Sequence, residues 1–168
     1  NVSRSRIARV SSAGALDTSF NPGTGANNTI NHISIDATGG ANAGKIVIGG
    51  KFTQFNGTNI NRIARLNSDG TFDSGFNPGA GANGDVLVTA IDSNGKVLIG
   101  GNFTQVDGSS RPRIARLNAD GTLDTTFVPG TGANGAVRAI FVDGSGNIFI
   151  GGDFTTYNST QRLRIAKL

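Results

Sequence analysis

Residues 113–116 read Arg-Ile-Ala-Arg, and the same tetrapeptide stands at 6–9 and 62–65, with Arg-Ile-Ala-Lys at 164–167. The copies begin 56, 51 and 51 residues apart, so the chain is a tandem repeat with a period near 51. A fixed period of this size is typical of solenoids, propellers and arrays. Residues that recur in every unit usually build the unit, so most of this sequence describes a fold rather than a biochemical function.

One repeat unit predicts four short antiparallel β-strands. In the second unit, the β-rich residues 86–92 end in Ser-Asn-Gly, a strong hairpin signal, and a second strand is predicted at 96–104. A polar loop at 105–112 leads to a third strand at 113–117, and a tight turn leads to a weaker fourth strand at 122–127. Four such strands in about 50 residues match one blade of a β-propeller. The predicted fold is therefore all-β, built from four-stranded antiparallel blades.

The repeat boundaries divide one domain, residues 1–168, into whole and partial blades. A partial blade with the third and fourth strands is predicted at 1–29, blades at 30–79 and 86–130, and a partial blade with the first to third strands at 136–168. Propellers close with about four to eight blades, so three repeats predict an incomplete ring or part of a larger one. Because open strand edges pair readily, we expect self-association or continuation in a longer chain.

Repeated glycines and phenylalanines predict the contacts between blades. A Gly-Gly pair ends each second strand and would let a neighbouring blade approach the backbone closely, at Gly49-Gly50, Gly100-Gly101 and Gly151-Gly152. Phenylalanines recur at two positions of each unit, as expected of apolar core rather than of a ligand site. They are Phe20, Phe52, Phe76, Phe103, Phe127 and Phe154.

Three quoted segments together resemble a known family. They are Gly-Lys-Val-Leu-Ile-Gly-Gly-Asn-Phe-Thr at 95–104, Arg-Ile-Ala-Arg-Leu-Asn-Ala-Asp-Gly-Thr-Leu-Asp-Thr-Thr-Phe at 113–127 and Pro-Gly-Thr-Gly-Ala-Asn-Gly at 129–135. With their copies, which cover essentially the whole chain, they resemble the delta-60 repeat, a β-propeller repeat of large secreted and surface proteins of bacteria. Kelch repeats are a weaker match, since they share the double glycine but expect a Trp that this chain lacks. The resemblance implies a propeller in an extracellular or cell-surface setting, and it brings no catalytic residues.

The charges follow the repeat. All eleven acidic residues are Asp, a turn residue. The net charge of +4 could attract a polyanion, but most bases and acids recur at fixed positions and predict ion pairs within each blade. Basic clusters interleaved with exposed aromatics, the pattern of nucleic-acid binding, are missing, and no apolar run reaches the length of a membrane span. We expect neither specific nucleic-acid binding nor membrane insertion.

Catalytic and metal sites find little support in the residues. The chain has no Cys, and its one histidine, His32, lacks the partners of a triad or zinc site. The turns at 67–73 and 118–124 faintly resemble calcium loops, but the EF-hand spacing requires a Glu that is nowhere in the chain. Hydrolysis by paired carboxylates needs acids in different environments, and three acids alone fall outside the repeated positions: Asp85, Asp107 and Asp153. We therefore predict no catalytic residue, no metal and no cofactor.

Positions that differ between otherwise matching units are the best candidates for ligand binding. One set lies five residues before the acid that ends the first strand, and a second follows the double glycine. A third lies in the loop before the third strand. These sets give Asn31, Leu87 and Arg138; Lys51, Asn102 and Asp153; and Asp107, Arg111 and Tyr157.

The sequence as a whole favours a non-enzymatic structural or adhesive module, extracellular or on the cell surface. In this hypothesis it binds a glycan or a surface protein through blade loops and assembles through blade edges. Two alternatives from other classes are a polysaccharide-cleaving enzyme with acids at the channel mouth and a calcium-dependent assembly module.

Overall fold

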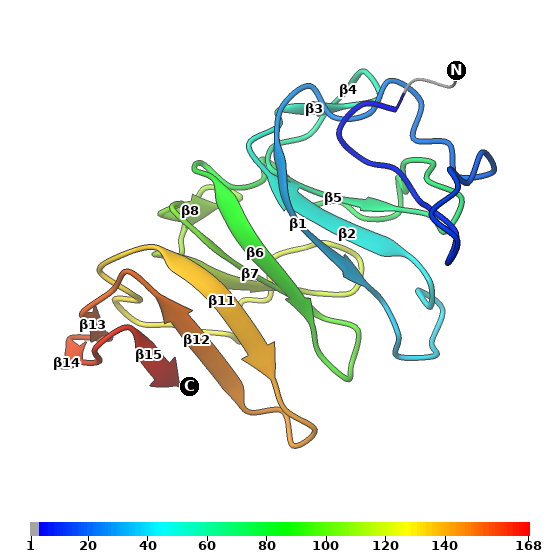
Figure 1. Ribbon diagram of the computed structural model, residues 1–168. Helices are drawn as coiled ribbons and strands as arrows, with labels where there is room; N and C mark the ends of the chain where they lie inside the picture. The colour runs from blue at the N-terminus through cyan, green and yellow to red at the C-terminus, as the bar shows by residue number, and fades with distance from the viewer. Residues whose placement is uncertain (1–3) are drawn as a thin grey trace.

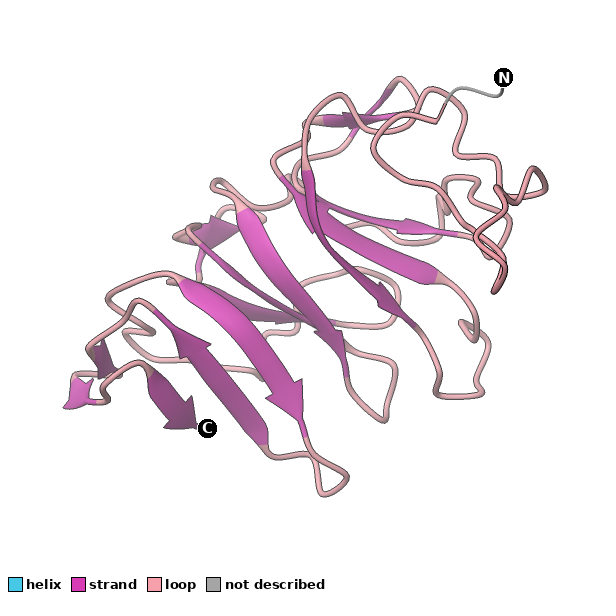
Figure 2. Cartoon of the chain, in the orientation of Figure 1, coloured by secondary structure: helices cyan, strands magenta, loops and turns pink. Residues whose placement is uncertain are grey.

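The computed structural model describes residues 4–168, so the first three residues of the partial blade predicted at 1–29 lie outside the described residues. The described chain forms fifteen short β-strands and no helix (Figure 2). It accordingly contains no helical segment long and apolar enough to cross a membrane.

Three antiparallel sheets form blades that lie side by side (Figure 1). Within each sheet the second strand is central, and β6 lies between β1 and β11. Across residues 4–168 the blades form an open arc and no closed ring, which confirms the predicted fold class of an incomplete propeller. Blade 1 consists of β1 (Ile30–Ile35), β2 (Ile46–Gly50) and β5 (Ile63–Leu66); blade 2 of β6 (Val86–Ile91), β7 (Val97–Gly101) and β10 (Ile114–Leu117); and blade 3 of β11 (Val137–Val142), β12 (Ile148–Gly152) and β15 (Ile165–Lys167).

The predicted fourth strand is shorter than expected. It is reduced to single bridges, Leu66 with Phe72 and Leu117 with Leu123. The chain turns immediately afterwards, because the N–H of Phe76 donates to the carbonyl of Asp73. This early turn carries Phe76 into the core between blades instead of extending the sheet.

The polar loop before each third strand is a small hairpin, which we did not predict. The hairpins pair β3 (Gln54–Phe55) with β4 (Thr58–Asn59), β8 (Gln105–Val106) with β9 (Ser109–Ser110), and β13 (Thr156–Tyr157) with β14 (Thr160–Gln161). Their two-residue turns have positive φ at both positions, 46° and 78° at Asn56-Gly57 and 46° and 70° at Asp107-Gly108. Asn-Gly and Asp-Gly are the residues that favour such turns, so the signal was present in the sequence.

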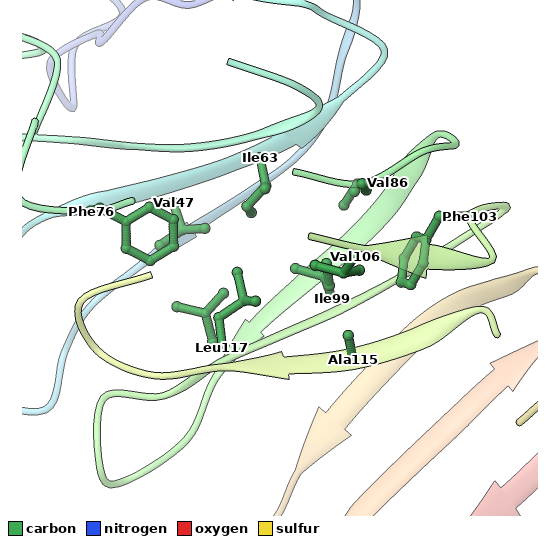
Figure 3. Packing of buried hydrophobic residues seen from close by; sticks show 11 residues of the cluster. Val47, Ile63, Phe76, Val86, Ile99, Phe103, Val106, Ala115 and Leu117 are labelled. Carbon is green, nitrogen blue, oxygen red and sulfur yellow. The ribbon is translucent and has the colours of Figure 1, made fainter. Parts of the chain in front are cut away.

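The hydrophobic core lies between blades, in successive layers. Figure 3 shows the layer between blades 1 and 2, where Val47, Ile63 and Phe76 of the first unit face Val86, Ile99 and Phe103 of the second. The predicted phenylalanines are buried in this layer and its equivalents, except Phe127, which is half-buried. Burial of a large side chain contributes about 1.5–3 kcal/mol, so these layers hold the blades together.

The double glycines approach two different neighbours. A Cβ on Gly100 would lie 2.7 Å from a methyl carbon of Val137 in blade 3, so this glycine admits the next blade, as predicted. A Cβ on Gly101 would instead collide with the backbone carbonyl of Asp85 in its own blade. The second glycine of the pair therefore leaves room for the backbone at the start of the first strand in its own blade.

Candidate functional site

Each first strand begins with a β-bulge, and the bulged residue is a candidate from the sequence. In blade 1, Ile30 pairs with Gly50 and His32 with Gly49, which leaves Asn31 without a register partner. The same shift leaves Leu87 unpaired in blade 2 and Arg138 unpaired in blade 3. A bulge redirects the extra side chain and is common beside functional sites.

The candidates after the double glycines lie against these bulges. The N–H of Lys51 donates to the carbonyl of Thr29 (2.8 Å), that of Asn102 to Asp85 (2.9 Å) and that of Asp153 to Ala136 (2.8 Å). Six candidates from three blades are thereby held at the starts of the first strands. We call this set the bulge surface: Asn31, Lys51, Leu87, Asn102, Arg138 and Asp153.

Polar contacts link the bulge surface within and between blades. The side-chain amide of Asn31 donates to the carbonyl of Val86 (2.9 Å), and Lys51 Nζ lies 3.5 Å from a carboxylate oxygen of Asp85, so both contacts join blade 1 to blade 2. In blade 3, Arg138 Nε lies 2.9 Å from each carboxylate oxygen of Asp153. This exposed pair raises the pKa of Arg138 and lowers that of Asp153, mainly through the hydrogen bonds between them.

The remaining three candidates lie apart from the bulges, on the small hairpins. Asp107 accepts a hydrogen bond from the N–H of Ala80 (2.9 Å), the role that Asn56 has towards Thr24 in blade 1. Arg111 donates to the adjacent carbonyl of Ser110 (2.7 Å). Tyr157 is half-buried against the core of blade 3, and this burial raises the pKa of its phenol.

Tyr157 occupies a core position of the repeat. It bridges to Ala133 as Phe55 bridges to Ala26 and Val106 to Ala82. Aligning these three residues in the sequence would have identified the position as core, since two of them are apolar. The hairpin candidates thus have framework contacts, and the bulge surface is the better candidate site.

The repeated charges are engaged in the framework, as predicted. Arg65 Nε donates to Asp73 (2.6 Å), Lys45 Nζ donates to the same carboxylate oxygen (2.9 Å), and Arg65 also reaches the carbonyl of Ala119 in blade 2 (2.5 Å). Blade 2 repeats the first two contacts with Arg116, Lys96 and Asp124. These side chains build blades, which leaves the unrepeated charges of the bulge surface for a ligand.

The buried carboxylates predict a loss of stability in acid. Burial alone would raise the pKa of Asp73 and Asp124, but hydrogen bonds from Lys45 and Arg65, and from Lys96, Thr126 and Arg116, outweigh it and lower both pKa values. A carboxyl with a lowered folded pKa stabilises the fold above its unfolded pKa and loses that contribution as pH falls through the folded value.

We therefore expect a melting temperature that is nearly constant above about pH 5 and falls steadily below about pH 4. Thermal unfolding followed by circular dichroism between pH 7 and pH 2 measures this curve. The variant Asp124→Asn is expected to be less stable at neutral pH and to show a shallower acid loss. An equally steep acid loss in Asp124→Asn would contradict this assignment.

A polar contact between the first strands was missed from the sequence. His32 Nδ1 lies 3.0 Å from Thr89 Oγ1, and Ser34 Oγ lies 2.7 Å from the same hydroxyl, so β1 and β6 share a small polar network. Partial burial lowers the pKa of His32. The alternation of polar residues along 30–35 was the available signal, and His32 is a half-buried strand residue.

The Asp side chains in the turns have lowered pKa values, as expected of carboxylates that stabilise a turn by hydrogen bonds. The Thr71 hydroxyl and N–H lower the pKa of Asp69, and Thr122 does the same for Asp120. A carboxyl acting as a general acid near neutral pH needs a raised pKa. Within residues 4–168, no three His, Cys, Asp or Glu side chains come together as a metal site would require.

Comparison with known proteins places the chain by family. The model of a β-propeller domain of unknown function (DUF5122) matches residues 1–20, 44–76, 93–127 and 144–168, which is more than half of the chain. The resemblance to a bacterial propeller repeat is thereby confirmed at the level of the family. Neither the curated proteins nor the solved structures contain a significant match.

Proposed function

We propose that this chain, which belongs to the family of β-propeller domains of unknown function (DUF5122), is a non-enzymatic structural and adhesive module. In this proposal it works outside the cell or on its surface and binds a glycan or a surface protein through the bulge surface. The resemblance to repeats of secreted bacterial proteins supports the extracellular setting.

One observation carries the proposal. The unrepeated polar and charged residues of three successive blades gather at the bulged strand starts, while the repeated charges hold the framework together. Rigid scaffolds that present variable residues at the ends of strands are a common way to build a binding site. The result is a row of hydrogen-bond donors and acceptors, suited to the hydroxyls of a glycan or the polar groups of a protein.

The electrostatics favour binding over catalysis. Asp153 is held by both of its oxygens to Arg138, and its pKa is lowered. A carboxylate in this state accepts hydrogen bonds well but does not donate a proton near neutral pH.

Binding to a glycan array and pull-down of surface proteins by this chain test the proposal. The double variant Lys51→Ala with Arg138→Ala is expected to weaken binding about tenfold or more, which corresponds to 1.4 kcal/mol. Because both ion pairs are exposed, the melting temperature should hardly change.

The matched control is Arg162→Ala, whose guanidinium donates to the neighbouring carbonyl of Gln161 on an outer hairpin. Its binding should equal that of the wild type. Turnover of a polysaccharide that is abolished by Asp85→Asn or Asp153→Asn would instead establish an enzyme. A large rise in melting temperature with calcium, reversed by a chelator, would establish the cation-dependent module.

A further inference from the structure

The large exposed hydrophobic side chains gather at the two ends of the arc. Within residues 4–168, four of them belong to the N-terminal segment (residues 4–29) or to blade 1, and three belong to blade 3. The eighth, Val128, follows the fourth-strand position of blade 2 and belongs to neither end. The others are Val10, Leu16, Ile33 and Ile35 at one end, and Phe141, Leu163 and Ile165 at the other.

The end at blade 3 repeats a surface that is buried inside the molecule. Leu98 and Ile114 of blade 2 pack against blade 3, and their equivalents in blade 3 are Phe149 and Ile165. Ile165 is 66% exposed, whereas Ile114 is 0% exposed. Phe141 lies beside Phe149 on the same surface, with ring centroids 6.3 Å apart and the ring planes tilted by 42°. We call this surface the C-end face: Phe141, Phe149, Leu163 and Ile165.

The end at blade 1 carries the complementary surface. An apolar groove there is lined by Ile7, Arg9, Phe20, Ile33, Ile35 and Ile46. Within the molecule, the positions of Ile35 and Ile46 recur as Ile91 and Val97, which pack in the layer against Val47 of blade 1. By this equivalence, the groove is shaped for the first and second strands of a further blade. We call it the N-end groove.

An open strand edge lies beside the groove. Residues 7–10 have the same sequence position as β5 and β10, which pair along four residues with β2 and β7. In the described structure, the strand contact of residues 7–10 is a single bridge from Val10 to Leu16. An edge with free backbone groups is a template for pairing with another chain.

We propose that two copies of this chain close into one six-bladed ring, with the C-end face of each copy seated in the N-end groove of the other. The repeat supplies the reason, because each new junction copies the one between blades 2 and 3. Six blades fall within the range in which propellers close. Head-to-tail junctions of this kind end in a ring when the rotation closes. The inference rests on the assembly through blade edges that the sequence favours, and it is independent of the bulge surface.

In each junction, β15 of one copy and residues 7–10 of the other compete for the same edge of β12. β12 now pairs with β15 through Phe149 to Lys167, Ile150 to Ala166 and Gly151 to Ile165. Residues 7–9 of the second copy follow an Arg and begin with Ile-Ala, as β15 does. They would therefore pair with the same edge of β12. In the ring, residues 7–10 of one copy therefore replace β15 of the other.

Anchoring decides which strand gives way. Arg9 bonds to Asp17 (2.8 Å) and to the carbonyl of Ser68 in blade 1 (2.6 Å), and Phe20 is buried against the same blade. β15 is held by three residue pairs and by the small side chain of Ala166, which is buried, while its large side chain, Ile165, is exposed. The N-terminal segment stays in place, and β15 leaves together with Leu163 and Ile165. Phe141 and Phe149 of the C-end face then fill the N-end groove, and Ile7 of the other copy takes the repeat position of Ile165.

Sedimentation velocity and light scattering test the assembly with the 168-residue chain. We expect a species of twice the 17.1 kDa monomer mass at micromolar concentration. Phe141→Asp and Ile33→Asp should each weaken association about 100-fold, because each places a charge in the junction. The control Ser109→Asp, on the exposed strand β9, should associate as the wild type does. A wild type that stays monomeric, or one that forms open-ended polymers, would overturn the ring.

Removal of residues 164–168 tests the exchange of strands. Since this deletion removes the competitor, we expect association at least about tenfold tighter, with the far-ultraviolet spectrum of the fold retained. Weaker association would overturn the exchange.

A disulfide trap tests the exchange without a deletion, because the chain has no cysteine of its own. Ala8→Cys with Ile150→Cys should oxidise to a covalent dimer, since Ala8 would take the register of Ala166 opposite Ile150. At a concentration where the chain is monomeric, Ile150→Cys with Ala166→Cys should cross-link within one chain. A covalent monomer or no cross-link from the Ala8 pair contradicts the exchange.

Ligand binding by Phe141→Asp separates the two proposals. A monomer that keeps glycan or protein binding shows that assembly and binding are distinct. A ring that forms but binds no ligand leaves the assembly intact and refutes the bulge surface.

Discussion

The variant Gly101→Ala is expected to destabilise the protein by about 3 kcal/mol, although it adds one methyl group. The new Cβ would fall inside the van der Waals radius of the Asp85 carbonyl oxygen and lie 3.1 Å from the backbone nitrogen of Leu87. Backbone cannot rotate away as a side chain does, so the bulge at the start of β6 would have to open. Chemical denaturation followed by circular dichroism measures the loss.

Gly151→Ala is the matched control for this variant. Its Cβ would lie 3.6 Å from the nearest atom, the Cβ of Ala139, which is ordinary contact. At a protein concentration where the chain is monomeric, its stability should stay within about 1 kcal/mol of the wild type. Equal losses for the two glycines would show that the sheet, rather than the bulge, disfavours alanine.

The variant Arg65→Ala is expected to lower the free energy of unfolding by about 3 kcal/mol. Arg65 is 4% exposed, and it joins Asp73 of blade 1 to the carbonyl of Ala119 in blade 2 while its guanidinium covers the ring of Phe76. Its removal leaves a buried carboxylate that keeps Lys45 and the N–H of Gly75 as partners but loses its guanidinium, and it leaves a gap between two blades. Denaturation midpoints give the loss, and the bulge surface should keep its ligand binding once the protein is folded.

Arg9→Ala removes the equivalent residue at the end of the arc and is the control. Arg9 makes the same kind of contacts, to Asp17 and to Ser68, but its ion pair is more open to solvent, with side chains 41% and 31% exposed against 5% and 9% for Arg65 and Asp73. Exposed pairs contribute little to stability, so the melting temperature should fall much less than for Arg65→Ala. If the two variants lose the same stability, burial is not what makes Arg65 important.

The period and the residue types determined most of the fold. A tetrapeptide that returns every 51 to 56 residues, with a double glycine and a phenylalanine at fixed distances from it, requires repeated sheets that pack against one another. The sequence also predicted ion pairs within each blade, because bases and acids recur with the unit, and the structure pairs Arg65 with Asp73. These features are local or periodic, and they can be read without knowing which parts of the chain meet.

The bulges were decided by the tertiary structure. Asn31, Leu87 and Arg138 were selected because they differ between units, and no shared residue type marks them as bulged. A bulge is a shift in the hydrogen-bond register between two strands, and it depends on the backbone of both. The sequence identified the three positions. The pairing of β1 with β2, and the equivalent pairings in the other two blades, place these residues at bulges on one surface.

The tertiary structure also decided which copies of the repeated tetrapeptide pair as strands. Arg-Ile-Ala-Arg at 113–116 leads into β10, which pairs along its whole length with β7, while the identical residues at 6–9 pair with no strand in the described structure. Propensity alone gives both segments the same tendency to extend. A strand forms only when a second backbone accepts its hydrogen bonds, so the partner, and not the sequence, decides which copy becomes part of a sheet.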